Sequence, residues 1–284
     1  MALSTINLTA GMRANLFSLQ KTSKDMEVTQ NRLSTGLKVN TALDDPLNFF
    51  AAQEHRTRAG DLASRKDGMS EAIQTIKAAN NGIEGITNLI AQAKSLAQSA
   101  LSASGSDALE YSNQFAEVLD QINTMAADSG YKGVNLLQEG ALTVQFAPSS
   151  DDSVLGLQGF GGTDTQFTVI DTTVVTSAGW TTGSGDTIAV SSTVIQTAIG
   201  GLEDATDELR VEAKKLSSNL SIITAREDFT AKMVNTLEDG AAKLTEADMN
   251  EEGANMLMLQ TRQALGTTSL SLASQAAQSV LRLF

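Results

Sequence analysis

The chain has 284 residues and a formal net charge of −13, with 41% hydrophobic but only 4% aromatic residues, two prolines and no cysteine. Its core must therefore be built from aliphatic side chains and alanine, as in helix bundles, and the scarcity of proline permits long helices. The lack of cysteine excludes disulfides, thiol chemistry and Cys-ligated zinc. The acidic balance argues against general nucleic-acid binding, which needs clustered lysine and arginine.

The charge is unevenly distributed. Residues 1–43 carry five bases and two acids, and residues 253–284 carry two bases and no acid, so the ends sum to +5 and the middle to −18. No run approaches the roughly 20 apolar residues that a membrane span requires. The first twenty residues lack a continuous apolar stretch, so we expect no cleavable signal peptide and no membrane insertion.

The N-terminal segment shows a seven-residue apolar repeat, which predicts a helix that packs along one stripe. The repeat falls on Met12, Leu19, Met26 and Leu33, is reinforced by Leu16 and Leu37, and is preceded by two further candidate packing residues, Leu3 and Ile6. Asp44-Asp45-Pro46 then reads as the start of a second helix, with an Asp cap and proline at the first helical position.

This second helix is predicted to run from about residue 46 to about residue 104. Its repeat falls on Leu62, Met69, Ile76, Ile83, Ile90 and Ala97. Residues 104–107 read as a turn with a new cap, and a shorter third helix is predicted to follow. Its apolar face comprises Tyr111, Phe115, Val118, Ile122 and Met125.

Residues 130–197 differ in kind, because they are rich in glycine and contain no Lys or Arg from Gly133 onward. Short alternating runs at residues 142–146 and 167–170 predict strands between turns. We interpret this segment as a small β-rich insert. An insert in this position brings the N- and C-terminal helical arms side by side.

The apolar repeat returns after the insert. It falls on Leu202, Leu209, Leu216, Ile223, Leu237 and Leu244. Residues 245–248 resemble a capping box that opens a final helix. In that helix the repeat falls on Met258, Leu265 and Leu272, and the chain ends in Val280, Leu283 and Phe284.

The predicted fold is mainly α: a long antiparallel helical bundle or coiled coil of N- and C-terminal segments with a small β-rich insert. Each stripe is narrow, so every helix needs a partner. The last segment has few charges and modest hydrophobicity, and ordering its backbone alone in water costs about 1–2 kcal/mol per residue. We therefore expect the terminal stripes to pack against other copies of the chain rather than only within one bundle.

No arrangement of residues predicts catalysis, a metal or a cofactor. The only histidine, His55, has alanine where a zinc-protease helix needs a second histidine, and its flanks indicate exposed helix surface. The glycines between 156 and 162 lack the lysine of a phosphate loop and read as β-turns. The aspartates of the insert lack the spacing of a calcium loop.

Three segments closely resemble the bacterial flagellins. The first comprises Asn31, Arg32, Leu33, Ser34, Thr35, Gly36, Leu37, Lys38, Val39 and Asn40, followed by Asp44 and Asp45. The second is residues 131–137. The third comprises residues 247–252, with Asp248 and Met249, and residues 275–281. The resemblance covers residues 1–140 and 198–284, and the C-terminal sequence is most similar to those of flagellins of α-proteobacteria.

The resemblance implies a structural subunit that polymerises into a filament outside the cell. Residues 1–43 with 250–284 would form the inner coiled coil, residues 44–140 with 198–249 the surrounding helical bundle, and residues 141–197 a solvent-facing insert. It also implies export through the flagellar type III apparatus, and an export chaperone, a filament cap and hook-junction proteins as partners.

Three alternatives remain at this point. A hook–filament junction protein shares the helical ends but usually carries a larger insert. A soluble coiled-coil adaptor explains the repeats but not the signatures at both ends. An enzyme on a helical scaffold has no supporting set of residues.

Overall fold

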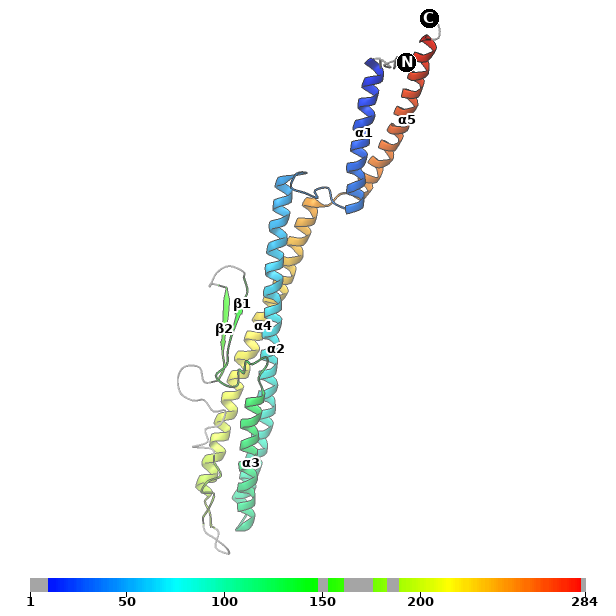
Figure 1. The fold of residues 1–284 in the computed structure, drawn as a ribbon. Helices are drawn as coiled ribbons and strands as arrows, with labels where there is room; N and C mark the ends of the chain where they lie inside the picture. The colour runs from blue at the N-terminus through cyan, green and yellow to red at the C-terminus, as the bar shows by residue number, and fades with distance from the viewer. Residues whose placement is uncertain (1–9, 148–152, 161–175, 183–188, 282–284) are drawn as a thin grey trace, which may run out of the picture. The chain divides into compact units, whose positions relative to one another are not determined.

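A computed structural model describes residues 10–147, 153–160, 176–182 and 189–281. Its elements, shown in Figure 1, are α1 (Ala10–Thr35), α2 (Pro46–Ser102), α3 (Ser106–Asp128), β1 (Ala141–Gln145), β2 (Val154–Gln158), β3 (Thr181–Thr182), β4 (Ala189–Val190), α4 (Ser192–Thr245) and α5 (Met249–Leu281). The predicted mainly α fold with a small β-rich middle is confirmed. The chain divides into unit 1 (Met1–Arg58 with Asn235–Phe284) and unit 2 (Ala59–Val234).

The core of unit 2 is built on the apolar repeat of α2. Its predicted positions from residue 69 onward are all buried: Met69, Ile76, Ile83, Ile90 and Ala97. A second buried row lies three residues beyond each of these: Ala72, Ala79, Ile86, Ala93 and Ala100. The alternating three- and four-residue spacing of the two rows is that of a coiled-coil seam, and the many alanines allow the neighbouring helices to approach closely.

α3 and α4 supply the partners of this seam. One face of each helix belongs to the same core cluster: Phe115, Leu119 and Ile122 of α3, and Leu202, Leu209, Leu216 and Ile223 of α4. A Cβ added at Gly82 would collide with Ser129 and Leu137, and one at Gly85 would collide with Met125. Glycine at these two positions of α2 is therefore what allows the end of α3 and the following turn to pack against it.

The β-rich part packs against this core. β1 and β2 pair antiparallel, with Val144 opposite Leu155, and the core cluster includes Val144, Leu157 and Phe160. Trp180, the only tryptophan, is fully buried, and its ring centroid lies 4.4 Å from that of Phe115. The predicted strand at residues 142–146 is confirmed, whereas the one at 167–170 lies outside the described residues.

The helix ends confirm most, but not all, of the predicted signals. The α2 start is confirmed, because Asp45 Oδ1 accepts a hydrogen bond from the Asn48 amide at 3.1 Å and Pro46 is the first helical residue. The prediction of a capping box at residues 245–248 is wrong. Thr245 is the last residue of α4, and Asp248 itself caps α5 by accepting hydrogen bonds from the amides of Asn250 and Glu251.

Two further boundaries differ from the prediction. The turn at residues 104–107 is present, but Gly105, at φ 56°, precedes α3 and no side chain caps that helix. α4 begins at Ser192, inside the stretch that we assigned to the insert, so the β-rich part of the described chain ends at Val190.

Candidate assembly surface and linker junction

α1 and α5 pair antiparallel in unit 1 (Figure 1), and Leu19 of the predicted stripe of α1 lies against Gly266 of α5. Met12 is buried and Leu19, Met26 and Leu33 are half-buried. The positions between them are polar or small: Asn15, Thr22, Thr29 and Gly36. This seam therefore has correct coiled-coil spacing but only one apolar row, which makes the pairing of two isolated helices weak.

α5 meets α1 through a different row from the predicted one. Leu259 and Glu252 are buried, and Gly266 lies where a Cβ would collide with the side chain of Leu19. Asn15 also donates a hydrogen bond to the carbonyl oxygen of Gly266 at 3.4 Å. A side chain at position 266 would therefore force the Leu19 side chain to move.

The predicted packing residues of α5 lie on its other side. Met258, Leu265 and Leu272 are 52%, 67% and 62% exposed, and Leu257 beside them is 68% exposed. We call these four residues the outer stripe of α5. A helix with apolar residues on two faces needs more than one partner, so the outer stripe is not accounted for by the pairing with α1.

The other predicted packing residues divide into two groups. Leu16 is 40% exposed, and Leu37 forms a β-bridge with Glu246. Leu3, Ile6, Leu283 and Phe284 lie outside the described residues, as does the side chain of Val280. Packing of these residues in an assembly remains a prediction.

An ion pair lies near the base of the α1–α5 seam. Arg32 Nη1 lies 2.8 Å from Glu252 Oε1, and the side chain of Glu252 is only 8% exposed. The second carboxylate oxygen, Oε2, is buried and has no hydrogen-bond partner among the described residues. A buried carboxylate in this position depends on Arg32, because removing a cation from such a pair leaves an uncompensated charge.

Next to this ion pair, the two linkers of unit 1 pair with each other. We call residues 36–45, between α1 and α2, and residues 246–248, between α4 and α5, the linker junction. The amides of Lys38 and Val39 donate to the carbonyl oxygen of Thr245, at 2.7 and 3.2 Å, and the Ala247 amide donates to that of Gly36, at 3.0 Å. The sequence gives no sign of this pairing, because backbone groups some 200 residues apart form it.

Glycine and aspartates fix the local shape of the junction. Gly36 has φ 72° and ends α1 with a hydrogen bond to the carbonyl oxygen of Arg32, which is a conformation that favours glycine. Asp44 Oδ2 accepts hydrogen bonds from the Thr41 amide at 2.9 Å, the Thr41 hydroxyl at 3.1 Å and the Asn40 amide at 3.1 Å. These three hydrogen bonds hold the pKa of the Asp44 carboxyl below its ordinary value, and the bond from the Thr41 amide has the largest effect.

Most of the predicted signature residues thus have a structural role at one place. Arg32 forms the ion pair with Glu252. Gly36 and Leu37 pair with the second linker, and Asp44 accepts hydrogen bonds from within the first linker. The remaining contacts belong to turns and helix caps. The carbonyl oxygen of Asn31 accepts a hydrogen bond from the Thr35 hydroxyl, and the Asn40 amide donates one to Asp44. Asp45 caps α2, Asp248 caps α5 just before Met249, and Ser34 is exposed.

No group of three or more His, Asp or Glu residues that could hold a metal occurs in the described part of the chain, and no helix in the same residues is long and apolar enough to span a bilayer. His55 is half-buried near Gly240 rather than on exposed surface, which corrects the prediction for that residue.

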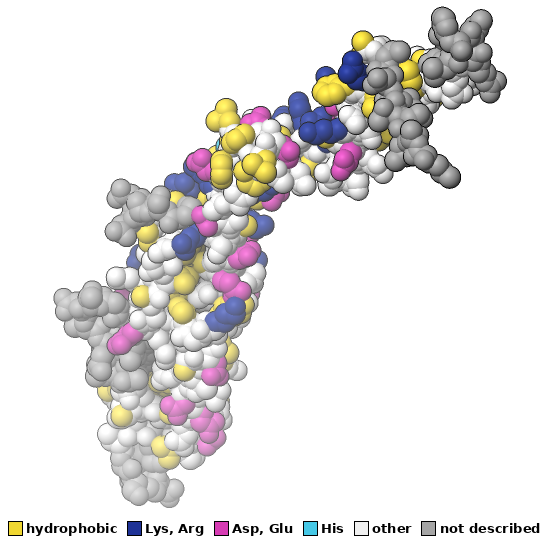
Figure 2. All heavy atoms as spheres, turned by 45° about the horizontal axis from the view of Figure 1, so that its top comes forward, with side chains coloured by type: hydrophobic (Ala, Val, Ile, Leu, Met, Phe, Trp, Pro, Cys, Tyr) yellow, Lys and Arg dark blue, Asp and Glu magenta, His cyan; other side chains and the backbone are white. Residues whose placement is uncertain are grey.

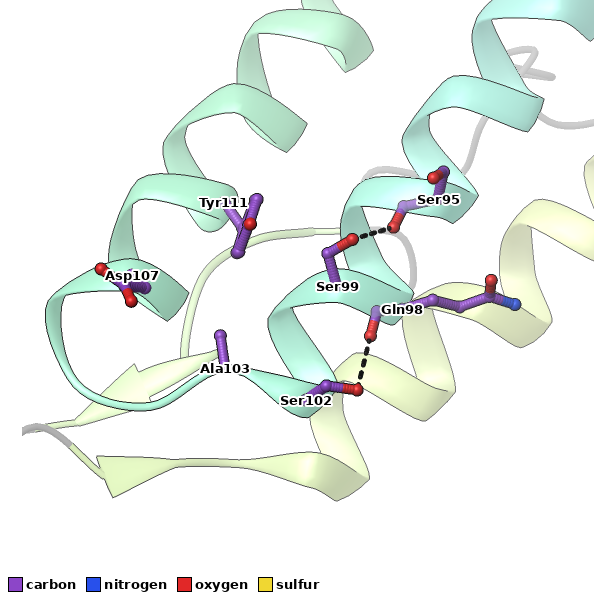
Figure 3. A pocket seen from close by; sticks show the side chains of 7 residues that line it. All are labelled: Ser95, Gln98, Ser99, Ser102, Ala103, Asp107 and Tyr111. Carbon is purple, nitrogen blue, oxygen red and sulfur yellow. Dashed lines mark hydrogen bonds between the residues drawn. The ribbon is translucent and has the colours of Figure 1, made fainter.

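An open groove of about 500 Å³ lies where α2 turns into α3 (Figure 3). Its lining is mostly hydroxyl-bearing: Ser95, Gln98, Ser99, Ser102, Ala103, Asp107 and Tyr111. Ser99 and Ser102 donate hydrogen bonds to carbonyl oxygens of their own helix, at 2.9 and 3.4 Å. The two hydroxyls are therefore engaged within α2, and no histidine or lysine is among the lining residues.

Two helical regions of a known protein family match this chain. The family described as the bacterial flagellin N-terminal helical region matches residues 5–141, and the corresponding C-terminal region matches residues 199–284. Flagellin FljM of Caulobacter vibrioides is 29% identical over 100% of both chains. A flagellin of Brucella melitensis is 28% identical over 95% of each.

Both organisms are α-proteobacteria, which confirms the narrower resemblance. A crystal structure of Bacillus cereus flagellin aligns with 57% of this chain and 88% of its own, at 16% identity and a TM-score of 0.44. The two family regions flank the β-rich part and include both linkers and all five helices except the first seven residues of α4. The chain belongs to the bacterial flagellin family and is a structural subunit of the flagellar filament.

Proposed function

We propose that unit 2 folds within each chain, whereas the terminal helices α1 and α5 become stable only when the outer stripe of α5 is covered by neighbouring subunits. The observation that carries this proposal is the distribution of the core. Every buried residue of the main hydrophobic cluster lies in unit 2. Among the described residues of unit 1, five hydrophobic side chains are buried: Met12, Val39, Ala52, Ala241 and Leu259.

Five buried side chains contribute little against the cost of ordering two helices of 26 and 33 residues. Full burial of a large aliphatic side chain contributes about 1.5–3 kcal/mol, whereas fixing the backbone costs about 1–2 kcal/mol per residue. Backbone hydrogen bonds offset part of this cost, and contacts with other copies must supply the rest. Assembly and ordering of the ends are then one event.

The proposal extends to the filament and its export. Residues 1–43 and 250–284 form the inner part of the filament, residues 44–140 and 198–249 surround it, and residues 141–197 face solvent. The subunit reaches the outside of the cell through the flagellar export apparatus, and an export chaperone, a filament cap and hook-junction proteins are its partners. The role is structural, and we expect no catalytic activity.

Changing Leu265 to serine tests the outer stripe. We expect Leu265→Ser to raise the critical concentration for filament growth about tenfold or more, because loss of roughly 1.5–3 kcal/mol of buried apolar contact changes an equilibrium by that factor. The measurement is the concentration of unassembled protein after growth from seeds and sedimentation of the filaments.

Leu109→Ser is the matched control, since Leu109 is 40% exposed on α3 of unit 2 and lies outside the proposed contact. Folding of both variants is checked by the fluorescence of Trp180. An unchanged critical concentration for Leu265→Ser, with normal filaments, would show that the outer stripe is not covered in the assembly.

A further inference from the structure

The outward face of α1 combines bases with large apolar side chains. Arg13, Phe17, Lys21, Lys24 and Val28 recur at three- and four-residue spacing and so lie in one row. All five are exposed, Phe17 by 75%. We call this row the basic face of α1; it lies opposite the row that meets α5.

The basic face has no electrostatic partner within the described chain. None of Arg13, Lys21 and Lys24 forms an ion pair with another described residue. The acids of α1, Asp25 and Glu27, lie on its flanks, about 80° around the helix from the row of bases at 100° per residue. The face therefore presents three positive charges and two apolar side chains to its surroundings.

A second uncovered surface lies in unit 1 at the beginning of α2. Leu43, Leu47 and Phe50 are 96%, 80% and 63% exposed, and hydrophobic side chains gather on the surface there (Figure 2). The exposed acids Asp44 and Glu54 flank them, whereas the third acid of residues 43–54, Asp45, is half-buried and caps α2. We call Leu43, Asp44, Leu47, Phe50 and Glu54 the acidic-rimmed patch.

These two surfaces are complementary in both respects that matter for binding. Each has large apolar side chains in the middle, and the three positive charges of the basic face have their counterpart in the exposed acids Asp44 and Glu54. The outer stripe of α5 is a poorer match for the basic face, since its only neighbouring charge is Arg262. Complementary charge favours encounter and selects the partner, and apolar contact supplies most of the affinity.

A filament of identical subunits needs such a pair of surfaces. A contact between two different patches of the same chain is heterologous, and it propagates into an open helical assembly when the rotation between neighbours does not close a ring. We therefore propose that the basic face of α1 docks on the acidic-rimmed patch of a second copy of this chain. The proposal rests on the filament function, and it names one contact within that assembly.

Cross-linking tests this contact directly, because the chain has no cysteine of its own. One population carries Phe17→Cys and the other Leu47→Cys; both positions are exposed in the single chain. The two populations are mixed, grown from wild-type seeds and oxidised mildly. We expect disulfide-linked dimers in filaments and none in a mixture that is oxidised without seeds.

Ser23→Cys replaces Phe17→Cys in the control mixture. Ser23 is exposed on the same helix but lies about 120° away from the basic face at 100° per residue. Filaments in which the Phe17 and Leu47 variants cross-link no more than the Ser23 and Leu47 variants would overturn the proposed contact. The filament function itself would stand, because wild-type protein is assembled alongside.

A charge reversal gives a second measurement that does not depend on cross-linking. Lys21→Glu together with Lys24→Glu is expected to raise the critical concentration about tenfold at low salt, because two attractive contacts become repulsive. The difference from wild type should shrink at 0.5–1 M salt, where the screening length falls to about 3–4 Å. A critical concentration equal to that of wild type at every salt concentration would contradict the proposal.

Discussion

A chain that ends at Met249, and so lacks residues 250–284, is expected to form no filaments while unit 2 keeps its fold. The truncation removes Leu259 and Gly266, which meet α1, and also the outer stripe of α5. It leaves α1 without its partner and the assembly without one of its apolar surfaces. Because the main core cluster lies entirely in unit 2, none of its buried residues is removed.

Electron microscopy after seeding measures the assembly of this truncated chain, and the fluorescence of Trp180 measures the fold of unit 2. Trp180 is fully buried against Phe115, so its emission should remain that of the intact chain. Normal filaments from the truncated chain would refute the role that we assign to α5. Exposed-tryptophan emission would mean that unit 2 depends on the ends, contrary to the proposed division of the chain.

Replacing Arg32 by alanine is expected to raise the critical concentration roughly hundredfold. The change leaves the carboxylate of Glu252, whose side chain is 8% exposed, without its cation at the base of the α1–α5 seam. Breaking a buried ion pair by removing one partner costs about 3–5 kcal/mol, and the partial exposure of Arg32 reduces this to about 3 kcal/mol, or roughly a hundredfold in an equilibrium.

Two further variants separate a lost charge from lost packing. Arg32→Ala with Glu252→Gln removes both charges and should recover a large part of the assembly, since a neutral amide is less costly to bury than an unpaired carboxylate. Lys77→Ala removes an exposed base from α2 of unit 2, outside the seam, and serves as the control. Equal effects of Arg32→Ala and Lys77→Ala would show that the ion pair does not stabilise the seam.

The sequence predicted the core of unit 2 well because two independent signals agree there. The repeat of α2 keeps its spacing from Met69 to Ala97, and that of α4 keeps it from Leu202 to Ile223. Each row consists of aliphatic residues or alanine with polar residues opposite. Only one face of each helix can then be buried, so the periodicity determines the packing.

The same rule fails for α5, because that helix has apolar residues on more than one face. The predicted row consists of Met258, Leu265 and Leu272, yet the row that meets α1 contains Glu252, Leu259 and Gly266. Sequence periodicity indicates that a stripe exists but not which partner covers it. The prediction that Met258, Leu265 and Leu272 are assembly residues therefore still needs the Leu265→Ser experiment.

The linker junction was beyond sequence reasoning for a different reason. The signature from Asn31 to Asp45 was recognised as a pattern, but its physical role depends on backbone hydrogen bonds to Thr245 and on the pairing of Arg32 with Glu252. Such contacts join residues about 200 positions apart and leave no periodic signal. The capping-box prediction failed because Asp248 itself caps α5, directly before its first residue, and the three residues before Asp248 belong to α4 or the linker.

Hydrogen exchange of monomer and filament tests the central claim most directly. In the monomer, we expect the amides of α1 and α5 to exchange at nearly unprotected rates and those of residues 69–100 of α2 to be strongly protected. In the filament, the amides of α1 and α5 should become protected as well, because neighbouring subunits cover the outer stripe of α5. Strong protection of α1 and α5 in the monomer would contradict the claim that the ends become stable only on assembly.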